Sequence, residues 1–273
     1  MPELPDLEVI RENLAARLLG RAVLSVGVRR PSLVQVGPQD LSPIRGQSLR
    51  DLTRRGKHLL FHFDNVYLIV HLMRYAWLWH GPSHYEVTKA TTMFISFDDT
   101  TDLRLIEPGT VQIAAVWLVQ DLAQAEALQK LGPEPLSAEF TLESFARALR
   151  GKRRMVKKII MDQSVIAGIG NAYADEILFR AKISPFRYVH TLSDAELETL
   201  WRAIPDTLLW AIREIKARVG GNLFDKEVRD FLYVHGRAGA PCRVCGTPIG
   251  EVLAEGQRTN YCPRCQNVSQ PSR

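Results

Sequence analysis

Four cysteines near the C-terminus constrain the fold of this 273-residue chain more than any other feature. They form two pairs, Cys242 with Cys245 and Cys262 with Cys265, and 16 residues separate the pairs. This spacing is typical of a closed structural zinc site with four thiolate ligands. A module of about 30 residues buries too little apolar surface to fold without such a metal. Two disulfides are the alternative, and we predict one structural Zn²⁺ instead.

The charge of the chain is modest. Lys and Arg outnumber Asp and Glu by 35 to 30, which permits a polyanionic partner without requiring one. Basic residues do gather at residues 54–57 and 152–158. The sequence contains no run of about 18 apolar residues, so we expect no membrane-spanning helix. The charged first 20 residues do not resemble a signal peptide, and all cysteines belong to the zinc motif, so we expect a cytoplasmic protein. We also expect it to be a monomer.

Hydrophobic periodicity divides the chain into a β-rich half and a helical half. Apolar residues at helical spacing predict a helix over residues 5–19. Short segments rich in β-forming residues follow at residues 22–28, 57–63, 67–72, 77–80, 92–97 and 111–119. Helical patterns then occupy residues 122–131, 141–149, 155–161, 172–182 and 194–219. We therefore predict an α+β multidomain protein, with an N-terminal β-sandwich and flanking helices in residues 1–133.

Two further domains follow in this prediction, a helical domain in residues 134–221 and a linker with the zinc finger in residues 222–273. Gly168 and Gly170 permit a tight turn between two of the helices. Asn171 then stands where it can cap the second of them.

The first residues of the chain carry candidate chemistry. Once Met1 is removed, Pro2 has a free secondary amine beside the carboxylate of Glu3. An α-amine ordinarily titrates near pH 8, so a useful fraction is neutral and nucleophilic under physiological conditions. Its attack on a sugar C1′ gives a cationic iminium, and a neighbouring carboxylic acid can protonate the ring oxygen or the leaving base. An ordinary Met-Pro start without chemistry is the alternative.

Five ordered motifs resemble those of formamidopyrimidine-DNA glycosylases and their relative endonuclease VIII, across the whole chain. They lie at residues 1–8, 54–60, 157–179, 234–237 and 241–266. The resemblance implies a helix-two-turn-helix domain over residues 134–221 and a zinc-finger β-hairpin at the C-terminus. It also implies damaged DNA as the partner, which in a bacterial cell associates the protein with the nucleoid.

The resemblance assigns roles to individual residues. Pro2 and Glu3 map to the nucleophile and proton donor, and Lys57 maps to the family's catalytic lysine, which can bind a phosphate. Lys157 and Asn171 map to the motif that holds DNA phosphate, where the N-terminus of a helix attracts anions. Arg258 maps to the arginine of the zinc-finger hairpin, although it stands four residues before Cys262 where the family has five. A one-residue shift reverses the face of a strand unless a bulge absorbs it.

The residues that read the lesion depart from the family pattern. Where the family has His-Leu-Gly-Met-Ser-Gly, an alignment without a gap puts Met73 at the glycine position and Arg74 at the methionine position that fills the emptied base stack. Met73 itself stands only one step from that methionine position. Where the family has Asp-x-Arg-Arg-Phe-Gly, Arg104 is kept, whereas Leu105 and Ile106 replace the second arginine and the phenylalanine wedge. Arg74 and Arg104 are therefore candidate DNA contacts.

A covering loop for the flipped base is also missing from this sequence, because about a dozen residues separate Gly221 from Val234. The alternating aromatic residues Tyr75, Trp77 and Trp79 either stack on bases or pack in the core.

The sequence therefore favours a bifunctional DNA glycosylase and abasic-site lyase of base-excision repair, with a substrate other than standard 8-oxoguanine. Two other hypotheses stay open. One is a non-catalytic protein that binds damaged DNA on the same scaffold. The other is a zinc-ribbon RNA-binding protein, which lacks an aromatic RNA-reading signature outside the region of Trp77.

Overall fold

The computed structural model describes residues 1–254 and 256–268, and the chain forms two compact units. Unit 1 comprises Met1–Lys130 with Ile215–Glu227, and unit 2 comprises Leu131–Glu214 with Val228–Arg273. Helix α6 (Asp194–Val219) contributes to both units. The division into three domains stays a prediction. Within the described residues, every helix is too short or too polar to span a bilayer.

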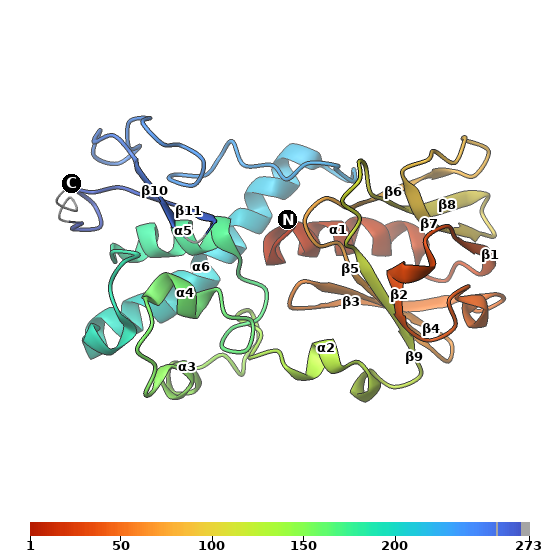
Figure 1. Ribbon diagram of the computed structural model, residues 1–273, viewed down its shortest axis with the longest axis horizontal. Coiled ribbons are helices and arrows are strands. Elements are labelled where there is room, and N and C mark those ends of the chain that lie inside the picture. Colours follow the sequence, from red (N-terminus) through yellow and green to blue (C-terminus); the bar gives the residue numbers. More distant parts are fainter. Residues whose placement is uncertain (255, 269–273) are drawn as a thin grey trace. The chain divides into compact units, whose positions relative to one another are not determined.

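Two β-sheets and one long helix build unit 1 (Figure 1). One sheet has the strand order β1-β7-β8-β6, and the other has the order β2-β9-β5-β4-β3. The strands are β1 (Val23–Val28), β2 (Val34–Val36), β3 (Leu49–Arg55), β4 (His58–Phe63), β5 (Tyr67–His71), β6 (Trp77–Pro82), β7 (Thr91–Phe97), β8 (Thr101–Ile106) and β9 (Ala115–Val119). Paired strands are antiparallel except β2 and β9, which are parallel.

The hydrophobic core of unit 1 explains why these elements pack together. Helix α1 (Leu4–Leu18) contributes the four residues whose spacing predicted the helix, Leu7, Ile10, Leu14 and Leu18. All four are buried in one cluster with side chains from both sheets. The helix lies along β3 and β4 (Figure 1). The predicted N-terminal β-sandwich with a flanking helix is therefore confirmed.

Three strands of the sandwich were missed in the sequence, namely β2, β3 and β8. A register shift between Leu49 and Asp51 interrupts the two-residue alternation of β3. Strand β8 contains the buried polar residues Asp102 and Arg104, which hide its apolar character. Strand β9 begins at Ala115 rather than at residue 111, because the preceding segment is a loop.

Unit 2 begins with short helices and contains the predicted helix pair. The helices are α3 (Leu142–Leu149), α4 (Val156–Ile160), α5 (Asn171–Ala181) and most of α6. Gly168 adopts a positive φ of 88° in the turn between α4 and α5. Gln163 stabilises this turn, since its side-chain amide donates to the carbonyl of Ile169 and its side-chain oxygen accepts from the N–H of Gly168. Short α2 (Glu126–Gln129) closes unit 1 and replaces the longer helix predicted over residues 122–131.

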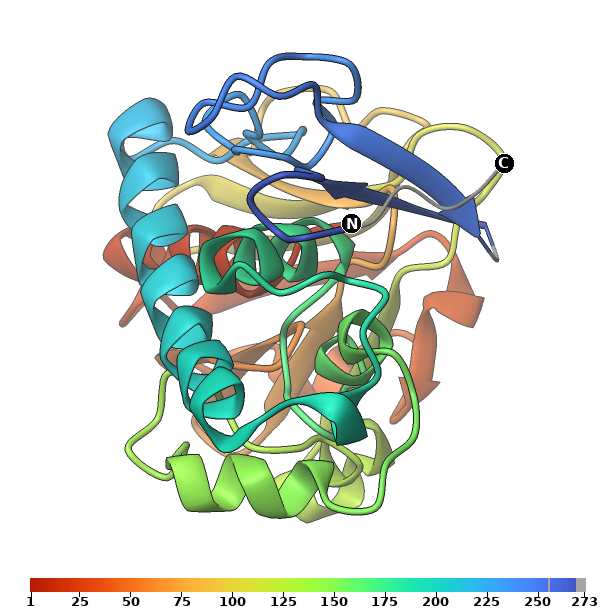
Figure 2. The ribbon, with the colours of Figure 1, turned by 90° about the vertical axis from the view of Figure 1, so that its left-hand side faces the viewer.

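A β-hairpin is the last regular secondary structure of the described chain. It consists of β10 (Gly250–Ala254) and β11 (Gln257–Tyr261), paired antiparallel. Strand β11 lies beside α5 (Figure 2). Phe179 of α5 packs against Val234, Ile249 and two of the cysteines, so the zinc module shares its small core with the helix.

Candidate active site, nucleic-acid interface and zinc centre

Pro2 and Glu3 lie at the N-terminal end of α1, where both are buried. Glu3 caps the helix, and its backbone N–H donates to Oδ2 of Asp6 at 2.9 Å in a reciprocal capping box. This arrangement fixes the backbone that carries both predicted catalytic residues. It also places them at the positive end of a 15-residue helix, which favours negative charge nearby.

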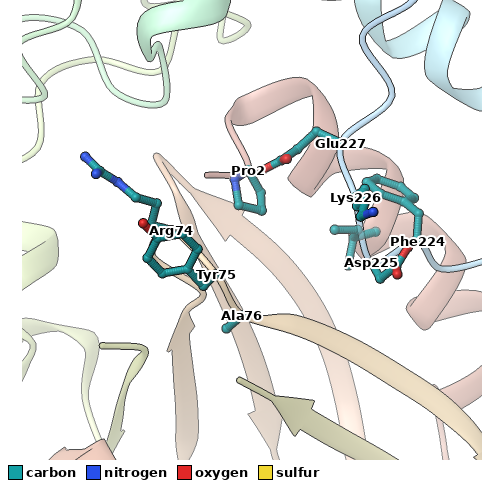
Figure 3. Close-up of a pocket in the computed structure, with 9 residues that line it drawn as sticks. Pro2, Arg74, Tyr75, Ala76, Phe224, Asp225, Lys226 and Glu227 are labelled. Atoms are coloured by element: carbon teal, nitrogen blue, oxygen red, sulfur yellow. The ribbon is translucent and has the colours of Figure 1, made fainter. Parts of the chain in front are cut away.

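An open pocket of about 210 Å³ lies in front of Pro2 (Figure 3). One side is formed by Arg74, Tyr75 and Ala76 from the turn between β5 and β6. The other side is formed by four consecutive residues that follow α6, namely Phe224, Asp225, Lys226 and Glu227. The Glu227 carboxylate points toward Pro2 (Figure 3) and pairs with the amine of Met1 at 2.7 Å.

Lys57 is a buried cation in unit 1, with only 7% of its surface exposed. It precedes β4 directly, and the alternating residues Leu59, Phe61 and Phe63 of that strand are all buried in the core. Burial lowers the pKa of Lys57, and the negative charge of Glu3 acts in the opposite direction. The charges of Lys57 and Glu3 therefore interact, as expected of residues in one site, and a solvated lysine at a strand end is not what we observe.

Arg74 is an exposed residue of the turn that lines the pocket. Its neighbour Met73 has a φ of 53°, in the left-handed region that favours glycine. Met73 stands at the glycine of the family pattern, so a residue with a Cβ occupies here a conformation that glycine adopts freely. The backbone at Met73 agrees with an alignment without a gap, and the role of Arg74 in the emptied base stack stays a prediction.

Arg104 does not fit the predicted DNA contact. Only 3% of its surface is exposed, and it pairs with Asp102 at 2.8 Å. Its guanidinium also donates to the carbonyls of Tyr85 and Glu86, and it stacks 4.7 Å from the centre of the Trp79 ring. These contacts hold the loop between β6 and β7. Leu105, which replaces the second arginine of the family pattern, is also fully buried.

Three residues predicted to bind DNA meet in unit 2, where α4 and α5 approach the hairpin. The carbonyl of Arg258 accepts hydrogen bonds from Nζ of Lys157 at 3.1 Å and from Nδ2 of Asn171 at 2.9 Å. Lys157 also donates to Oγ1 of Thr259 and pairs with Asp175 at 2.7 Å. The helix pair and the zinc finger therefore form one structure at this point.

The environment of Lys157 argues against its predicted contact with phosphate. The side chain is 6% exposed, its ammonium group donates to the Arg258 carbonyl and the Thr259 hydroxyl, and Asp175 balances its charge as an ion-pair partner. Lys157 instead positions the hairpin. Asn171 is partly exposed at the first turn of α5, so a role at phosphate stays a prediction for this residue.

Arg258 is the most exposed of these residues, with 70% of its side chain accessible. The hairpin pairs Leu253 with Arg258 and Ala254 with Gln257 without a bulge. Gln257, which stands five residues before Cys262, therefore faces the opposite side from Arg258. The one-residue shift found in the sequence is not absorbed, and the DNA contact of Arg258 stays a prediction.

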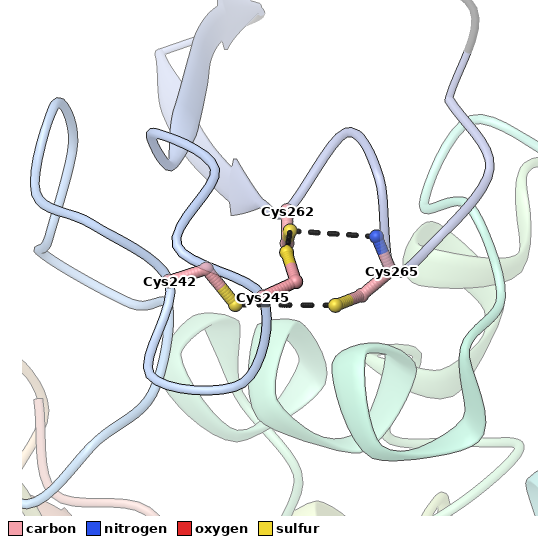
Figure 4. Close-up of side chains that lie close together, drawn as sticks. All are labelled: Cys242, Cys245, Cys262 and Cys265. Atoms are coloured by element: carbon pink, nitrogen blue, oxygen red, sulfur yellow. Dashed lines mark hydrogen bonds between the residues drawn. The ribbon is translucent and has the colours of Figure 1, made fainter.

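The four cysteines converge as predicted (Figure 4). Their sulfur atoms all lie within 4.8 Å of one another, with 3.9 Å between Cys242 and Cys265 and 3.5 Å between Cys245 and Cys262. These separations are far longer than an S–S bond of about 2 Å, so the cysteines are free. They fit a tetrahedral zinc ion with Zn–S bonds of about 2.3 Å. Backbone N–H groups of Val244 and Cys265 donate to the sulfurs, the outer support that such sites require.

The aromatic residues near the pocket do not form one continuous strand pattern. Tyr75 lies in the turn before β6 and is 47% exposed, whereas Trp77 and Trp79 are half-buried on that strand. Trp79 is covered by Arg104 and lies 6.0 Å from Tyr85. Tyr75 is thus the aromatic residue of this group that faces the pocket of Pro2.

The pocket residues that follow α6, above all Glu227, were not predicted from the sequence. No local pattern marks them, because only the fold brings residues 224–227 to the N-terminus.

Three family models match the chain in the order of the observed structure. Residues 1–112 match the formamidopyrimidine-DNA glycosylase N-terminal domain, and residues 131–220 match the H2TH domain of the same enzymes. Residues 239–268 match the zinc finger found in formamidopyrimidine-DNA glycosylase and isoleucyl-tRNA synthetase.

Relatives and solved structures agree with these matches. Formamidopyrimidine-DNA glycosylase from Listeria innocua is 34% identical over 275 residues, which cover 97% of this chain and all of that protein. The enzyme from Herpetosiphon aurantiacus is 36% identical with the same coverage. The solved MutM (Fpg) protein of Thermus thermophilus has a TM-score of 0.84 at 32% identity, covering 98% of this chain and all of its own. The Lactococcus lactis enzyme bound to DNA containing an abasic site has a TM-score of 0.86 at 28% identity, with 97% and 99% covered.

The fold is thus that of a zinc-finger DNA-repair protein with a helix-two-turn-helix domain. The chain belongs to the formamidopyrimidine-DNA glycosylase family.

Proposed function

We propose that this protein is a DNA glycosylase with abasic-site lyase activity, acting through a Schiff base on Pro2. The observation that carries the proposal is the open pocket lined by Pro2 at the capped start of α1, with Glu3 beside it and the charge of Lys57 coupled to that of Glu3. An amine nucleophile, an acid and a buried cation are the groups that such a reaction needs.

Each residue then has one role. With Met1 removed, the Pro2 amine attacks C1′ of a nucleotide that has left the base stack. Glu3 supplies the proton for the leaving base or the sugar oxygen. Lys57 binds the neighbouring phosphate, where its burial strengthens the attraction between the charges. Elimination from the iminium nicks the strand.

Damaged DNA is the proposed partner. The Lactococcus lactis relative has been solved with DNA containing an abasic site and with DNA containing Fapy-dG. Exposed Arg258, partly exposed Asn171 and exposed Arg74 are the described residues that we assign to the DNA backbone and the emptied stack. One chain carries all of these groups, so we infer that the protein acts as a monomer.

The substrate is proposed to differ from standard 8-oxoguanine. The segment that lines the pocket after α6 is short, and the buried Leu105 and half-buried Ile106 replace the family's base-reading arginine and wedge. An aromatic pair, Tyr75 and Phe224, stands on opposite sides of the pocket instead. These two rings suit stacking on a planar base or base fragment.

A panel of lesion duplexes tests this function. Protein lacking Met1, verified by intact mass, is incubated with duplexes that carry an abasic site, oxidised purines or oxidised pyrimidines, with single-stranded controls. We expect nicking of the abasic duplex and release of at least one damaged base. The rate of base release should fall by about 10²-fold or more in Glu3→Gln, as for removal of a general acid. Tight binding to abasic DNA without any nicking would identify a non-catalytic damage-binding protein instead.

A further inference from the structure

The carboxylate of Glu227 lies against the chain terminus that carries the proposed nucleophile. Its Oε1 is 2.7 Å from the Met1 amine, and Glu227 and Pro2 line the same pocket. When Met1 is removed, the amine moves by one residue, a distance of about 3.8 Å between Cα atoms. The Glu227 side chain points toward Pro2 (Figure 3) and has enough rotatable bonds to follow that shift.

The segment that bears Glu227 is anchored to the same helix that carries Pro2. Asn13 of α1 donates from Nδ2 to the carbonyls of Gly220 and Asn222, at 3.3 and 2.9 Å. Leu223 and Phe224 then pack against the core of unit 1. Helix α1 thus positions both partners of the ion pair between the terminal amine and Glu227. The chain terminus lies at its start, and Asn13 holds the segment that bears Glu227.

We propose that Glu227 is a catalytic proton acceptor for the Pro2 amine, a role that rests on the proposed Schiff-base function. A secondary amine that attacks a carbon keeps its own proton and gains a positive charge, so it needs a base before its lone pair can form the C=N bond. Glu3 cannot serve as this base while it acts as the acid on the sugar. A second carboxylate at the amine resolves this conflict.

The reaction starts from an abasic sugar in its open aldehyde form. The Pro2 nitrogen bonds to C1′ while the π electron pair of the carbonyl moves onto oxygen, which takes a proton from Glu3. Glu227 then accepts the proton of the positively charged nitrogen. The freed lone pair forms the C1′=N bond as the hydroxyl leaves, and that hydroxyl takes the proton back from Glu227 and departs as water. The products are the iminium, water and two carboxylates.

The test measures the rate of adduct formation rather than its presence. Wild type, Glu227→Gln and Glu227→Ala, each verified to lack Met1, are mixed with an abasic duplex and trapped with borohydride at successive times, from about pH 5.5 to about pH 9, a range that spans the ordinary titration of an α-amine. We expect Glu227→Gln to form the adduct about 10²-fold more slowly, the lower range for loss of a general base. Affinity for a duplex with a reduced abasic site should stay within about threefold of wild type, which also reports on folding.

Chemical rescue separates proton transfer from simple positioning. Added formate or acetate should restore part of the rate in Glu227→Ala, with more rescue by the more basic acetate. Glu126→Gln is the matched control, because it makes the same charge change at an exposed residue of α2 that pairs with Lys130.

Each outcome has a defined meaning. A rate in Glu227→Gln within about threefold of the Glu126→Gln control overturns the inference, and so does a slow Glu227→Ala that no carboxylate rescues. Absence of any adduct in the wild type defeats the Schiff-base function itself, so the two failures are distinguishable.

Discussion

Met73 holds a left-handed backbone conformation that its side chain disfavours, with φ at 53°. For a residue with a Cβ atom this region costs about 1–2 kcal/mol, whereas glycine adopts it freely but loses more entropy on folding. We expect Met73→Gly to raise the free energy of unfolding by about 0.5–1 kcal/mol. Urea denaturation measures the change, and Met73→Ala is the matched control because it keeps the Cβ. A glycine variant no more stable than the alanine variant would contradict the strain.

In unit 1, His58 is buried and His71 is half-buried, and their ring centroids lie 4.6 Å apart. Burial lowers the pKa of His58 to about 4 and that of His71 to about 3. The folded protein therefore keeps both rings neutral where the unfolded chain, with pKa values near 6.5, protonates them. The two neutral histidines therefore contribute fully to the free energy of unfolding above about pH 6.5, and this contribution declines as the pH falls toward about 4.

Each of these histidines should cost about 2 kcal/mol of stability at about pH 5 relative to about pH 7.5. Between about pH 7.5 and about pH 5, we expect the free energy of unfolding of His58→Phe to fall by about 2 kcal/mol less than that of the wild type. Urea denaturation of the two proteins at both pH values gives the difference, in which the titrations common to both cancel. Equal losses in wild type and variant would show that His58 is not buried in its neutral form.

The hairpin β10–β11 is the element whose stability depends on metal. Its core is small and includes two of the four thiolates, so zinc binding supplies much of its folding free energy. We expect chelation of zinc, or Cys245→Ser, to abolish hydrogen-exchange protection of the hairpin amides while the amides of the β-sandwich stay protected. Loss of protection in both units together would contradict a zinc module whose folding is separate from that of unit 1.

The same hairpin should present Arg258 to DNA. Because its side chain is exposed, Arg258→Met should reduce the slope of log Kobs against log salt by about 1, the effect of one lost phosphate contact. Gln257→Ala, on the opposite face, is the control and should leave the slope unchanged. Titrations of an abasic duplex at several salt concentrations measure both slopes. An unchanged slope in Arg258→Met would remove this residue from the interface.

Helices and strands could be predicted from the sequence where a single local pattern marks the whole element. The apolar face of α1, the limits of α6 and the cysteine pairs are all recognisable locally. Strand β3 was missed because a bulge breaks its alternation, and β8 because Asp102 and Arg104 are buried together within it. A buried ion pair inside a strand has no local signature, since its partners and the loop carbonyls it binds are fixed only by the fold.

Over the whole molecule, only those residues of the candidate site that are marked by a local motif could be predicted from the sequence. Pro2, Glu3 and the zinc ligands could be identified from the sequence because their chemistry lies in neighbouring residues. Glu227 could not, because 224 positions separate it from Glu3 and no motif connects them. Lys157 was placed on the correct helix, but its charge is neutralised by Asp175, a partner that the sequence does not indicate.

The decisive measurement is borohydride trapping on an abasic duplex with protein that lacks Met1, followed by peptide mass analysis. Our mechanism predicts a covalent DNA adduct on the nitrogen of Pro2 and none in protein that retains Met1. No adduct in the processed protein, or an adduct on Lys57 in place of Pro2, would contradict it.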